Sequence, residues 1–269
     1  MNIIASIKSR IRQKQAQDFS KTKYGKKLAA LKDSHKGERC FIVGNGPSLT
    51  VEDLDQIRKL GIPTFATNRI FKLFEQTPWR PTFYVSEDII LMRDAQDIIL
   101  QMPVENRFIP INLKWFENVD IKNADYFYMD YKTSLNENFG LSMDISKSIR
   151  CRGTVTMTCL QIAVYMGFSE IFLIGVDHNF AKMFDKNGNV IIDNTVKNHF
   201  SEEYDKGIFD QGFQVDAATE AYFDMEKLSR KLKTFKIYNA TRGGKLEVYQ
   251  RIDLDSFFEN KTLQGDKQA

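Results

Sequence analysis

The sequence predicts an α/β fold with a mostly parallel sheet, helices on both faces and an inserted, lid-like segment. Three observations lead to this prediction. Strand-like and helix-like patterns alternate along most of the chain. One apolar run, Cys40 to Val43, leads directly into Gly44-Asn45-Gly46. Polar residues follow several other apolar runs, as they do where parallel strands end at a common crevice.

The segment 39–48 is expected to form a buried strand, a turn and the approach to a helix. Its two glycines let the backbone approach a phosphate or a ribose, and the Asn45 amide offers a donor and an acceptor. The Gly-Lys-Ser/Thr of a P-loop is missing, and Pro47 and Ser48 replace the run to the third glycine of the dinucleotide fingerprint. A nucleotide-binding turn and a tight turn without a ligand both fit this pattern.

The next elements follow in order. Thr50 and Asp53 form a capping box for a helix that runs to Leu60 and ends at Gly61. Further strands are expected at 64–67, 81–85, 107–111 and 126–129, and a helix is expected at 89–101.

The second half of the chain continues the alternation. A helix is expected at 154–166 and a strongly apolar strand at 171–177. Residues 178–214 are polar, aromatic and rich in turn formers, which suits a lid or an acceptor-binding insertion. A helix at 217–232 and a strand at 235–238 complete the pattern, and the segment 239–244 that follows fits a pocket wall or a plain turn.

Polar side chains stand at the ends of four of the predicted strands. These are Asn45, Asn68, the pair Glu87 and Asp88, and Asp177. The carboxyl ends of parallel strands meet at one edge of a sheet, so we expect these side chains to share a ligand site. By contrast, Asp53-Leu-Asp55 and Asp253-Leu-Asp255 are interpreted as solvated surface rather than as metal ligands.

The composition, 42% hydrophobic and 27% charged, is typical of a soluble globular protein. No run of about 18 apolar residues predicts a membrane-spanning helix. The cysteines Cys40, Cys151 and Cys159 lack metal spacing and predict buried thiols in a reducing compartment, so we expect a cytoplasmic protein.

The positive charge is concentrated near the N-terminus. Residues 1–40 hold eleven Lys/Arg and three Asp/Glu, about +8, and the whole chain carries +3, so the remainder carries about −5. Ile3, Ile4, Ile7 and Ile11 fall on one helical face among basic residues, which is typical of a helix that lies on anionic lipid of the inner leaflet. A solvated helix packed on the body or on another subunit fits as well, and a homo-oligomer is left open. Few aromatic residues accompany the basic ones, and no nucleic-acid-binding module is recognisable, so no nucleic acid partner is expected.

These features divide the chain into three parts. Residues 1–37 are predicted to form a basic amphipathic arm, 38–260 an α/β domain with the insertion 178–214, and 261–269 a disordered tail.

The assembled motifs resemble two related families. One is the MptE-like domain family, and the other is the bacterial sialyltransferases of glycosyltransferase family 42. The resemblance rests on Ile42-Val-Gly-Asn-Gly-Pro-Ser48, the strand ending at Asn68, Phe83-Tyr84, and the stretch from Arg152 through Thr154 to Gly167-Phe-Ser-Glu-Ile-Phe-Leu-Ile-Gly-Val-Asp177. It implies a Rossmann-like (GT-A-like) fold and an enzyme, a sialyltransferase-like glycosyltransferase.

By this resemblance the donor is a nucleotide-activated sugar, a CMP-activated nonulosonic or sialic-acid-like sugar above all. The residues implied in binding it are Gly44, Asn45, Gly46, Pro47, Ser48, Asn68, Ser86, Asp88, Arg152, Gly153, Thr154 and Asp177. An Arg side chain suits an anionic donor because its planar fork pairs with carboxylate or phosphate. The chain departs from the sialyltransferases at Val85, Val155 and Asn179, where they carry Asn, Ser and Tyr.

Transfer to a hydroxyl group needs a base, and histidine is the usual choice. The sialyltransferases carry their base in the corresponding insertion, so the resemblance implies His199, with His178 second, and Tyr204 as the group that helps the phosphate leave. A surface-loop histidine without a catalytic role is the competing interpretation of His199. His35 lies too early in the chain to be a good candidate.

The resemblance therefore implies sugar transfer in cell-surface polysaccharide or flagellin glycosylation, with a glycan or glycolipid acceptor, at the cytoplasmic side of the inner membrane. No cofactor and no metal ligand are assigned for the chemistry. The first alternative is a 6-hydroxymethylpterin pyrophosphokinase, in which Glu87 and Asp88 hold Mg²⁺ with ATP. The second alternative is a non-catalytic scaffold in glycan assembly.

Overall fold

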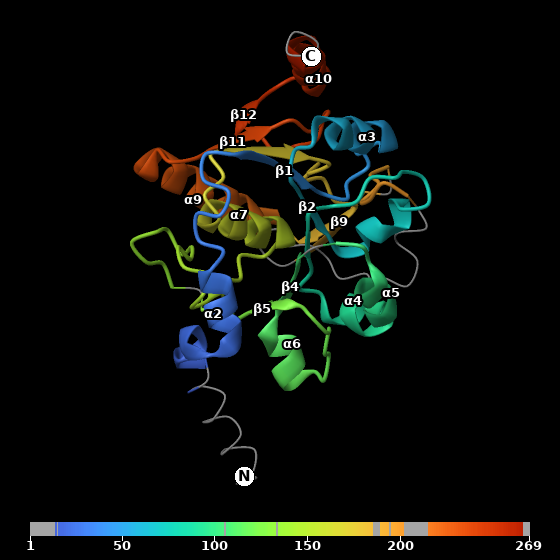
Figure 1. Cartoon of the computed structure of the whole chain (residues 1–269). Coiled ribbons are helices and arrows are strands. Elements are labelled where there is room, and N and C mark those ends of the chain that lie inside the picture. Colours follow the sequence, from blue (N-terminus) through green and yellow to red (C-terminus); the bar gives the residue numbers. More distant parts are fainter. Residues whose placement is uncertain are drawn as a thin grey trace.

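A parallel sheet of eight strands forms the centre of the molecule (Figure 1). The structure is a computed structural model that describes residues 14, 16–104, 106–132, 134–184, 189–193, 195–201 and 215–265. The strand order is β12-β11-β8-β1-β2-β3-β4-β5, and every neighbouring pair in it is parallel. The predicted α/β fold class is confirmed.

The sheet has eight strands, of which all but β12 overlap a run that was predicted to be a strand. They are β1 (Arg39–Val43), β2 (Thr64–Thr67), β3 (Phe83–Val85), β4 (Asn106–Pro110), β5 (Asp125–Phe127), β8 (Glu170–Ile174), β11 (Lys236–Asn239) and β12 (Gln250–Arg251). The central strands β1 and β8 are buried along almost their whole length, as expected for strands covered on both faces. Two short strands, β6 (Met129–Asp130) and β7 (Ile149–Arg150), pair outside the main sheet.

Helices cover both faces of the sheet. Figure 1 shows α2 (Lys23–Ala29), α7 (Val155–Tyr165) and α9 (Val215–Leu232) on one side, and α3 (Val51–Leu60), α4 (Ile89–Asp94) and α5 (Gln96–Gln101) on the other. The short helices η2 (Asn68–Leu73) and α6 (Ile111–Phe116) follow β2 and β4. The capping box of Thr50 and Asp53 begins α3, and Gly61, with φ +64°, ends it. The single helix predicted at 89–101 is broken at Ala95, where the backbone leaves helical angles.

The order of the strands places a topological switch point between β1 and β8. From β1 the chain moves outward through β2 and β3 to β5, and it then returns to β8 on the other side of β1. The loops that follow β1 and β8 therefore diverge. Ligands of open α/β sheets bind in the crevice that such divergence opens at the carboxyl ends of the strands.

The N-terminal boundary predicted at residue 37 is wrong. The helix α2 packs on the edge strand β5, and η1 (Phe19–Lys21) packs on α2, so both belong to the body. Phe19 is fully buried against Trp115 and Tyr128. Lys27 extends to the buried carboxylate of Asp125, with 2.7 Å between Nζ and Oδ1. The isoleucines of the predicted amphipathic arm lie outside the described residues.

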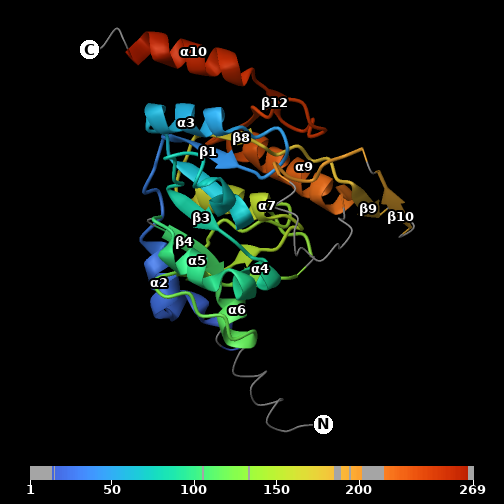
Figure 2. The same ribbon diagram turned by 90° about the vertical axis from the view of Figure 1, so that its right-hand side faces the viewer.

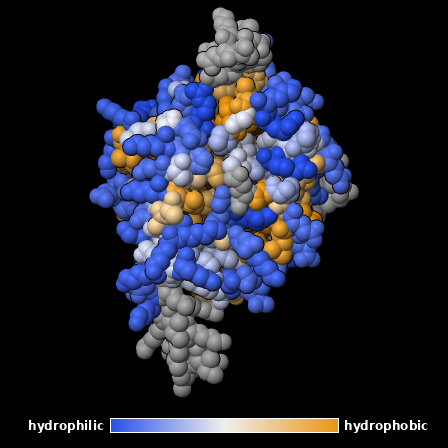
Figure 3. Space-filling view, viewed as in Figure 1, coloured by the Kyte–Doolittle hydropathy of each residue, from blue (hydrophilic) through white to orange (hydrophobic). Residues whose placement is uncertain are grey.

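The C-terminal helix α10 (Leu254–Gly265) lies at the opposite end of the molecule, beyond β12 (Figures 1 and 2). Its Phe257 packs on Phe41 and Phe172 of the central strands. Hydrophobic residues also gather beneath this end of the chain on the largely hydrophilic face of Figure 3. The tail predicted from residue 261 is corrected, because α10 continues to Gly265; residues 266–269 lie outside the described residues.

One arginine joins α3 and α10. Arg242 donates to both carboxylate oxygens of Asp53, at 2.8 and 2.6 Å, and to Asp255 at 2.5 Å. The predicted solvated role is therefore wrong for Asp53, whose side chain is buried in this ion pair, while Asp255 is exposed.

Candidate functional site

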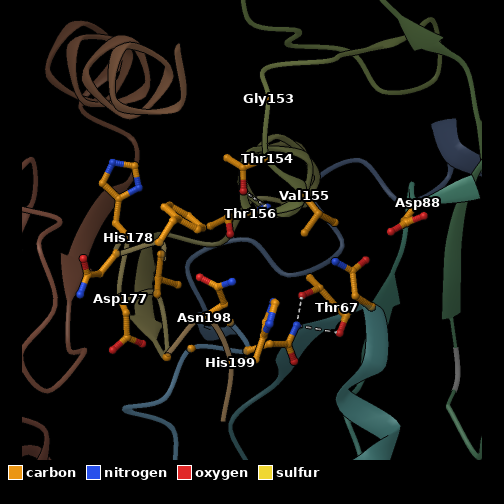
Figure 4. A pocket seen from close by; sticks show the side chains of 18 of the residues that line it. Thr67, Asp88, Gly153, Thr154, Val155, Thr156, Asp177, His178, Asn198 and His199 are labelled. Carbon is orange, nitrogen blue, oxygen red and sulfur yellow. Dashed lines mark hydrogen bonds between the residues drawn. The ribbon is translucent and has the colours of Figure 1, made fainter. Parts of the chain in front are cut away.

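A cavity of about 540 Å³ lies at the switch point between β1 and β8 (Figure 4). The loops after β1, β2, β3 and β8 line it, together with the N-terminus of α7 and part of the insertion. The strand-end residues that the sequence singled out, Asn45, Asn68, Glu87, Asp88 and Asp177, all line this one cavity. Its size is that of a small-molecule site.

The turn after β1 comes close to the turn after β8. A Cβ atom on Gly44 would lie 2.3 Å from the carbonyl oxygen of Gly175, and one on Gly46 would lie 1.9 Å from Oδ2 of Asp177. Both separations are far below contact distance, so this approach requires glycine at both positions.

Asn45 lies between these glycines with half of its amide unpaired. Its Nδ2 donates to the carbonyl oxygen of Thr67 at 3.1 Å and to the Thr67 hydroxyl at 3.0 Å. Its Oδ1 is buried and has no hydrogen-bond partner in the part of the chain that the structure describes. A buried acceptor without a partner is unfavourable, so the arrangement suits a ligand that donates a hydrogen bond here.

Asp177 lies in the loop after β8, and its side chain stabilises the turn that follows β1. Its Oδ2 accepts a hydrogen bond from the Ser48 hydroxyl at 2.8 Å, and burial raises its pKa above the usual range. Behind it, the backbone N–H of Lys245 donates to the Asp177 carbonyl at 2.7 Å, and the Thr241 hydroxyl accepts from the Val176 N–H. The segment 239–244 thus supports this loop from behind rather than lining the cavity.

Asn68 follows β2 in a left-handed conformation, with φ +50°. The Tyr84 hydroxyl donates to its backbone carbonyl at 2.8 Å, and the Ser86 hydroxyl donates to its Oδ1 at 3.2 Å. Ser86 itself is fully buried and does not line the cavity, so the structure gives it a positioning role toward Asn68 in place of the predicted donor contact.

The N-terminus of α7 points toward the cavity. Thr154 caps the helix, and Gly153, Thr154, Val155 and Thr156 line the cavity wall (Figure 4). The first N–H groups of a helix and its dipole attract a negative charge to the N-terminal end of the helix axis. This end of the cavity can therefore receive a phosphate.

Glu87 and Asp88 follow β3 and have different surroundings. Glu87 accepts a hydrogen bond from the Thr158 hydroxyl of α7, at 2.8 Å on Oε2. Removal from water raises the pKa of Glu87 from 4.5 to about 6, although the Thr158 bond acts in the opposite direction. Asp88 is exposed and caps α4, where its Oδ1 accepts from the N–H groups of Ile90 and Leu91.

His178 lies on the other side of the cavity from Asp88 (Figure 4). Its Nε2 is 2.7 Å from the Thr219 hydroxyl, which donates its hydrogen to the Val215 carbonyl. We therefore assign Nε2 as the donor to Thr219 and Nδ1 as the acceptor nitrogen of the neutral ring. Burial lowers the pKa of His178, which favours this neutral form.

His199 reaches the cavity from the insertion. The insertion contains the hairpin of β9 (Lys182–Phe184) and β10 (Val190–Ile192), and it then folds back over the site. The N–H of Phe200 donates to the Asn45 carbonyl at 3.0 Å, and Asn198 Oδ1 accepts from the Ala181 N–H at 2.7 Å. These bonds place Asn198 and His199 at the cavity (Figure 4). Tyr204 lies outside the described residues.

Four residues assigned to donor binding do not line the cavity. Arg152 pairs instead with Asp224 of α9, at 2.5 Å, which corrects its predicted place beside the donor. Pro47 is exposed, Ser48 supports Asp177, and Ser86 supports Asn68. The described lining residues include three carboxylates and no lysine or arginine.

Several lining residues were not assigned from the sequence. They are Thr67, Val155, Thr156, Gly175, Val176, Asn179, Phe180, Asn198 and Tyr222. Tyr222 comes from α9, whose helical pattern carries no signal of a site, and burial raises its pKa to about 12. Asn179 resembles Asn45, since its Oδ1 is buried without a partner among the described residues.

The described residues were also considered as metal ligands. In the ranges that the structure describes, no group of three or more His, Cys, Asp or Glu side chains is arranged to hold a metal ion. Glu87 and Asp88 could still share a cation with substrate phosphates, as Mg²⁺ sites commonly do. None of the described helices is long and apolar enough to cross a membrane.

Comparisons with known proteins agree with this fold. One solved structure that resembles the chain is the MAf glycosyltransferase from Magnetospirillum magneticum AMB-1, with a TM-score of 0.52 and 16% sequence identity. The match covers 87% of this chain but 38% of that one, so the chain spans less than half of that protein. The comparison with curated proteins gives no match.

A family model described as 6-hydroxymethylpterin diphosphokinase MptE-like matches residues 13–183, which is more than half of the chain. The match includes the Gly-Asn-Gly turn, the N-terminus of α7 and the strand that ends before Asp177. The chain belongs to the MptE-like family.

Proposed function

We propose that this protein is a glycosyltransferase that moves a sugar from a nucleotide-activated donor to a hydroxyl acceptor. The observation that carries this proposal is the cavity at the switch point, where Gly44 and Gly46 bring the backbone close and Asn45 Oδ1 has no partner among the described residues. The likeness to a structure titled MAf glycosyltransferase supports the fold that such a reaction uses.

The two sides of the cavity suit the two parts of the donor. Asn45 Oδ1 can accept a hydrogen bond from a nucleobase amino group or a ribose hydroxyl. The N–H groups that begin α7 can receive the phosphate. In this proposal the N-terminus of α7 stabilises the negative charge of the phosphate, because Arg152 is already paired with Asp224.

The finer identity of the donor follows the family resemblance. We propose a CMP-activated nonulosonic or sialic-acid-like sugar, and a glycan or glycolipid acceptor in surface polysaccharide or flagellin glycosylation. We propose that the basic N-terminal arm brings the enzyme to anionic lipid at the cytoplasmic face of the inner membrane. The acceptor would enter past His199, which the insertion holds at the cavity, and His178 would face it from the strand end.

Calorimetry tests the donor. Titrations with CMP, UMP and CMP-sialic acid should show saturable binding of a cytidine nucleotide by the full chain. Asn45→Ala should weaken this binding, because the variant loses the acceptor that faces the cavity. Glu75→Gln, on an exposed residue outside the cavity, is the matched control. Absence of binding to any cytidine or uridine nucleotide would sink the proposal and favour the non-catalytic scaffold.

A second candidate function is a 6-hydroxymethylpterin diphosphokinase. Two observations favour it: the printed description of the family, and the placement of Glu87 and Asp88 in the same cavity. Carboxylates and phosphate oxygens are the ligands that Mg²⁺ prefers. This function predicts Mg²⁺-dependent ATP binding and release of AMP with 6-hydroxymethylpterin as acceptor. A chain that binds cytidine nucleotides and releases no AMP is not this kinase.

A further inference from the structure

We propose that Glu87 is a catalytic residue of this site, the base that takes the proton from the acceptor hydroxyl. The inference rests on the proposed glycosyl transfer. It assigns to a carboxylate at the end of β3 a role that the sequence led us to expect of a histidine.

The position of Glu87 is fixed by rigid elements. It follows β3, whose three residues are buried, and its carboxylate is held by the second turn of α7. Thr158, the donor of that bond, is 1% exposed and belongs to the core. A base that is oriented by a buried hydrogen-bond donor keeps one geometry, which proton transfer requires.

One carboxylate oxygen remains available to a substrate. The Thr158 hydroxyl occupies Oε2, and no described residue donates to Oε1. Glu87 lines the cavity that Asn45 and α7 also line. A hydroxyl group of an acceptor in this cavity can therefore donate to Oε1.

The proposed step balances with the groups present. The O–H bond of the acceptor breaks and its proton moves to Oε1 of Glu87, while the acceptor oxygen forms a bond to the anomeric carbon. The bond between that carbon and the phosphate oxygen breaks, and the nucleotide leaves with the electron pair. Glu87, now a carboxylic acid, returns the proton to solvent.

The two histidines line the same cavity, and this proposal gives them the task of positioning the acceptor. His178 is held by the bond of Nε2 to Thr219 and keeps Nδ1 as an acceptor nitrogen. His199 lies in the insertion, where the N–H of Phe200 donates to the Asn45 carbonyl.

The test uses the full chain with CMP-sialic acid as donor and water as acceptor, and it measures CMP release. Glu87→Gln keeps the acceptor atom for Thr158 and removes the base. We expect unchanged CMP affinity by calorimetry and a loss of turnover of roughly 100-fold or more. Glu75→Gln, an exposed carboxylate outside the cavity, should behave as wild type.

A second readout separates a base from a structural group. Formate should restore part of the turnover of Glu87→Ala, because it supplies the missing carboxylate. If Glu87→Gln turns over as fast as wild type, or if formate restores no turnover to Glu87→Ala, Glu87 is not the base.

Failure of the proposed function looks different from failure of this inference. A wild-type chain that binds no nucleotide or hydrolyses no sugar nucleotide overturns both. A wild-type chain that binds and turns over, beside an equally active Glu87→Gln variant, overturns the role of Glu87 alone. If Glu87→Gln does not fold, Glu87→Asp carries the test, since it keeps the charge but withdraws it by one methylene: retained full turnover would contradict the inference.

Discussion

Gly46 shows how a single residue sets the shape of the site. A Cβ atom at this position would lie 1.9 Å from Oδ2 of Asp177 and 2.8 Å from the carbonyl oxygen of Gly175. The two turns at the switch point can approach each other only without that atom. The glycine is therefore explained by a contact across the sheet, not by its own backbone angles.

We predict that Gly46→Ala loses nucleotide binding and lowers the free energy of unfolding by about 1–3 kcal/mol, the usual penalty of overpacking. Calorimetry with CMP and urea unfolding measure the two effects. Gly37→Ala is the control for a glycine-to-alanine change without a steric clash, because a Cβ atom there meets nothing within 4 Å. Its φ of +81° adds backbone strain but no overpacking. Normal CMP binding by Gly46→Ala would contradict the proposed close approach of the nucleotide.

His199 provides a test on the acceptor side. The insertion holds it at the cavity, away from the strand ends that are proposed to bind the nucleotide. We predict that His199→Ala retains nucleotide binding and loses most of the transfer. Unchanged turnover would remove His199 from the mechanism.

Glu87 links function to stability through its raised pKa. A carboxyl group with a pKa of 4.5 when unfolded and about 6 when folded stabilises the fold below pH 4.5, and this contribution is lost as the pH rises through 6. Glu87→Gln lacks this partly desolvated charge. We therefore predict that it is more stable than wild type at pH 8, on the order of 2 kcal/mol, and equal to it at pH 4. Urea unfolding at the two pH values measures this, and a less stable variant at pH 8 would contradict it.

At the scale of elements, η1 and α2 are part of the fold. Phe19 is fully buried against Trp115 and Tyr128, and Lys27 pairs with buried Asp125. Sequence composition assigned this segment to a basic arm because lysines dominate it. The few apolar residues that fix it are too sparse to form a recognisable pattern.

We predict that Phe19→Ala lowers the free energy of unfolding by about 3–5 kcal/mol, as expected when a buried phenylalanine is removed. Lys26→Ala, on the exposed face of the following helix α2, should change it little. Urea denaturation with an unchanged m-value is the measurement. If Phe19→Ala is as stable as wild type, η1 and α2 do not belong to the packed body.

The elements best predicted are those whose signals are local. The capping box of Thr50 and Asp53 and the glycine at 61 fixed both ends of α3. The apolar run before Gly44 fixed β1. The predicted strand 171–177 was too long, because the backbone turns at Gly175, with φ +62°, and Val176 and Asp177 enter the loop.

At the scale of the whole molecule, the charge asymmetry predicts binding to anionic lipid. The first 40 residues carry about +8. We predict that the full chain binds vesicles containing anionic lipid, that it does not bind neutral vesicles, and that salt weakens the binding. Replacing Lys8 and Arg12 by Glu should abolish it without changing nucleotide affinity. Equal binding to neutral and anionic vesicles would contradict the proposal.

The sequence by itself determined the order of most elements, the parallel sheet and the strand-end residues that meet at one cavity. These follow from local signals: apolar periodicity, caps, glycines, and the rule that parallel strands expose their carboxyl ends together. Asn45, Asn68 and Asp177 could be placed in this way, because each closely follows a strand.

Only the tertiary structure decided which side chains are free to act. Arg152 was expected at the donor but is neutralised by Asp224, and Ser86 is turned inward to hold Asn68. Tyr222 reaches the cavity from a helix with no sign of a site in its sequence. Pairing and burial depend on residues that are distant in the chain, so no local pattern could reveal them. The same distant contacts, Thr158 with Glu87 above all, fix the side chains on which the proposed chemistry depends.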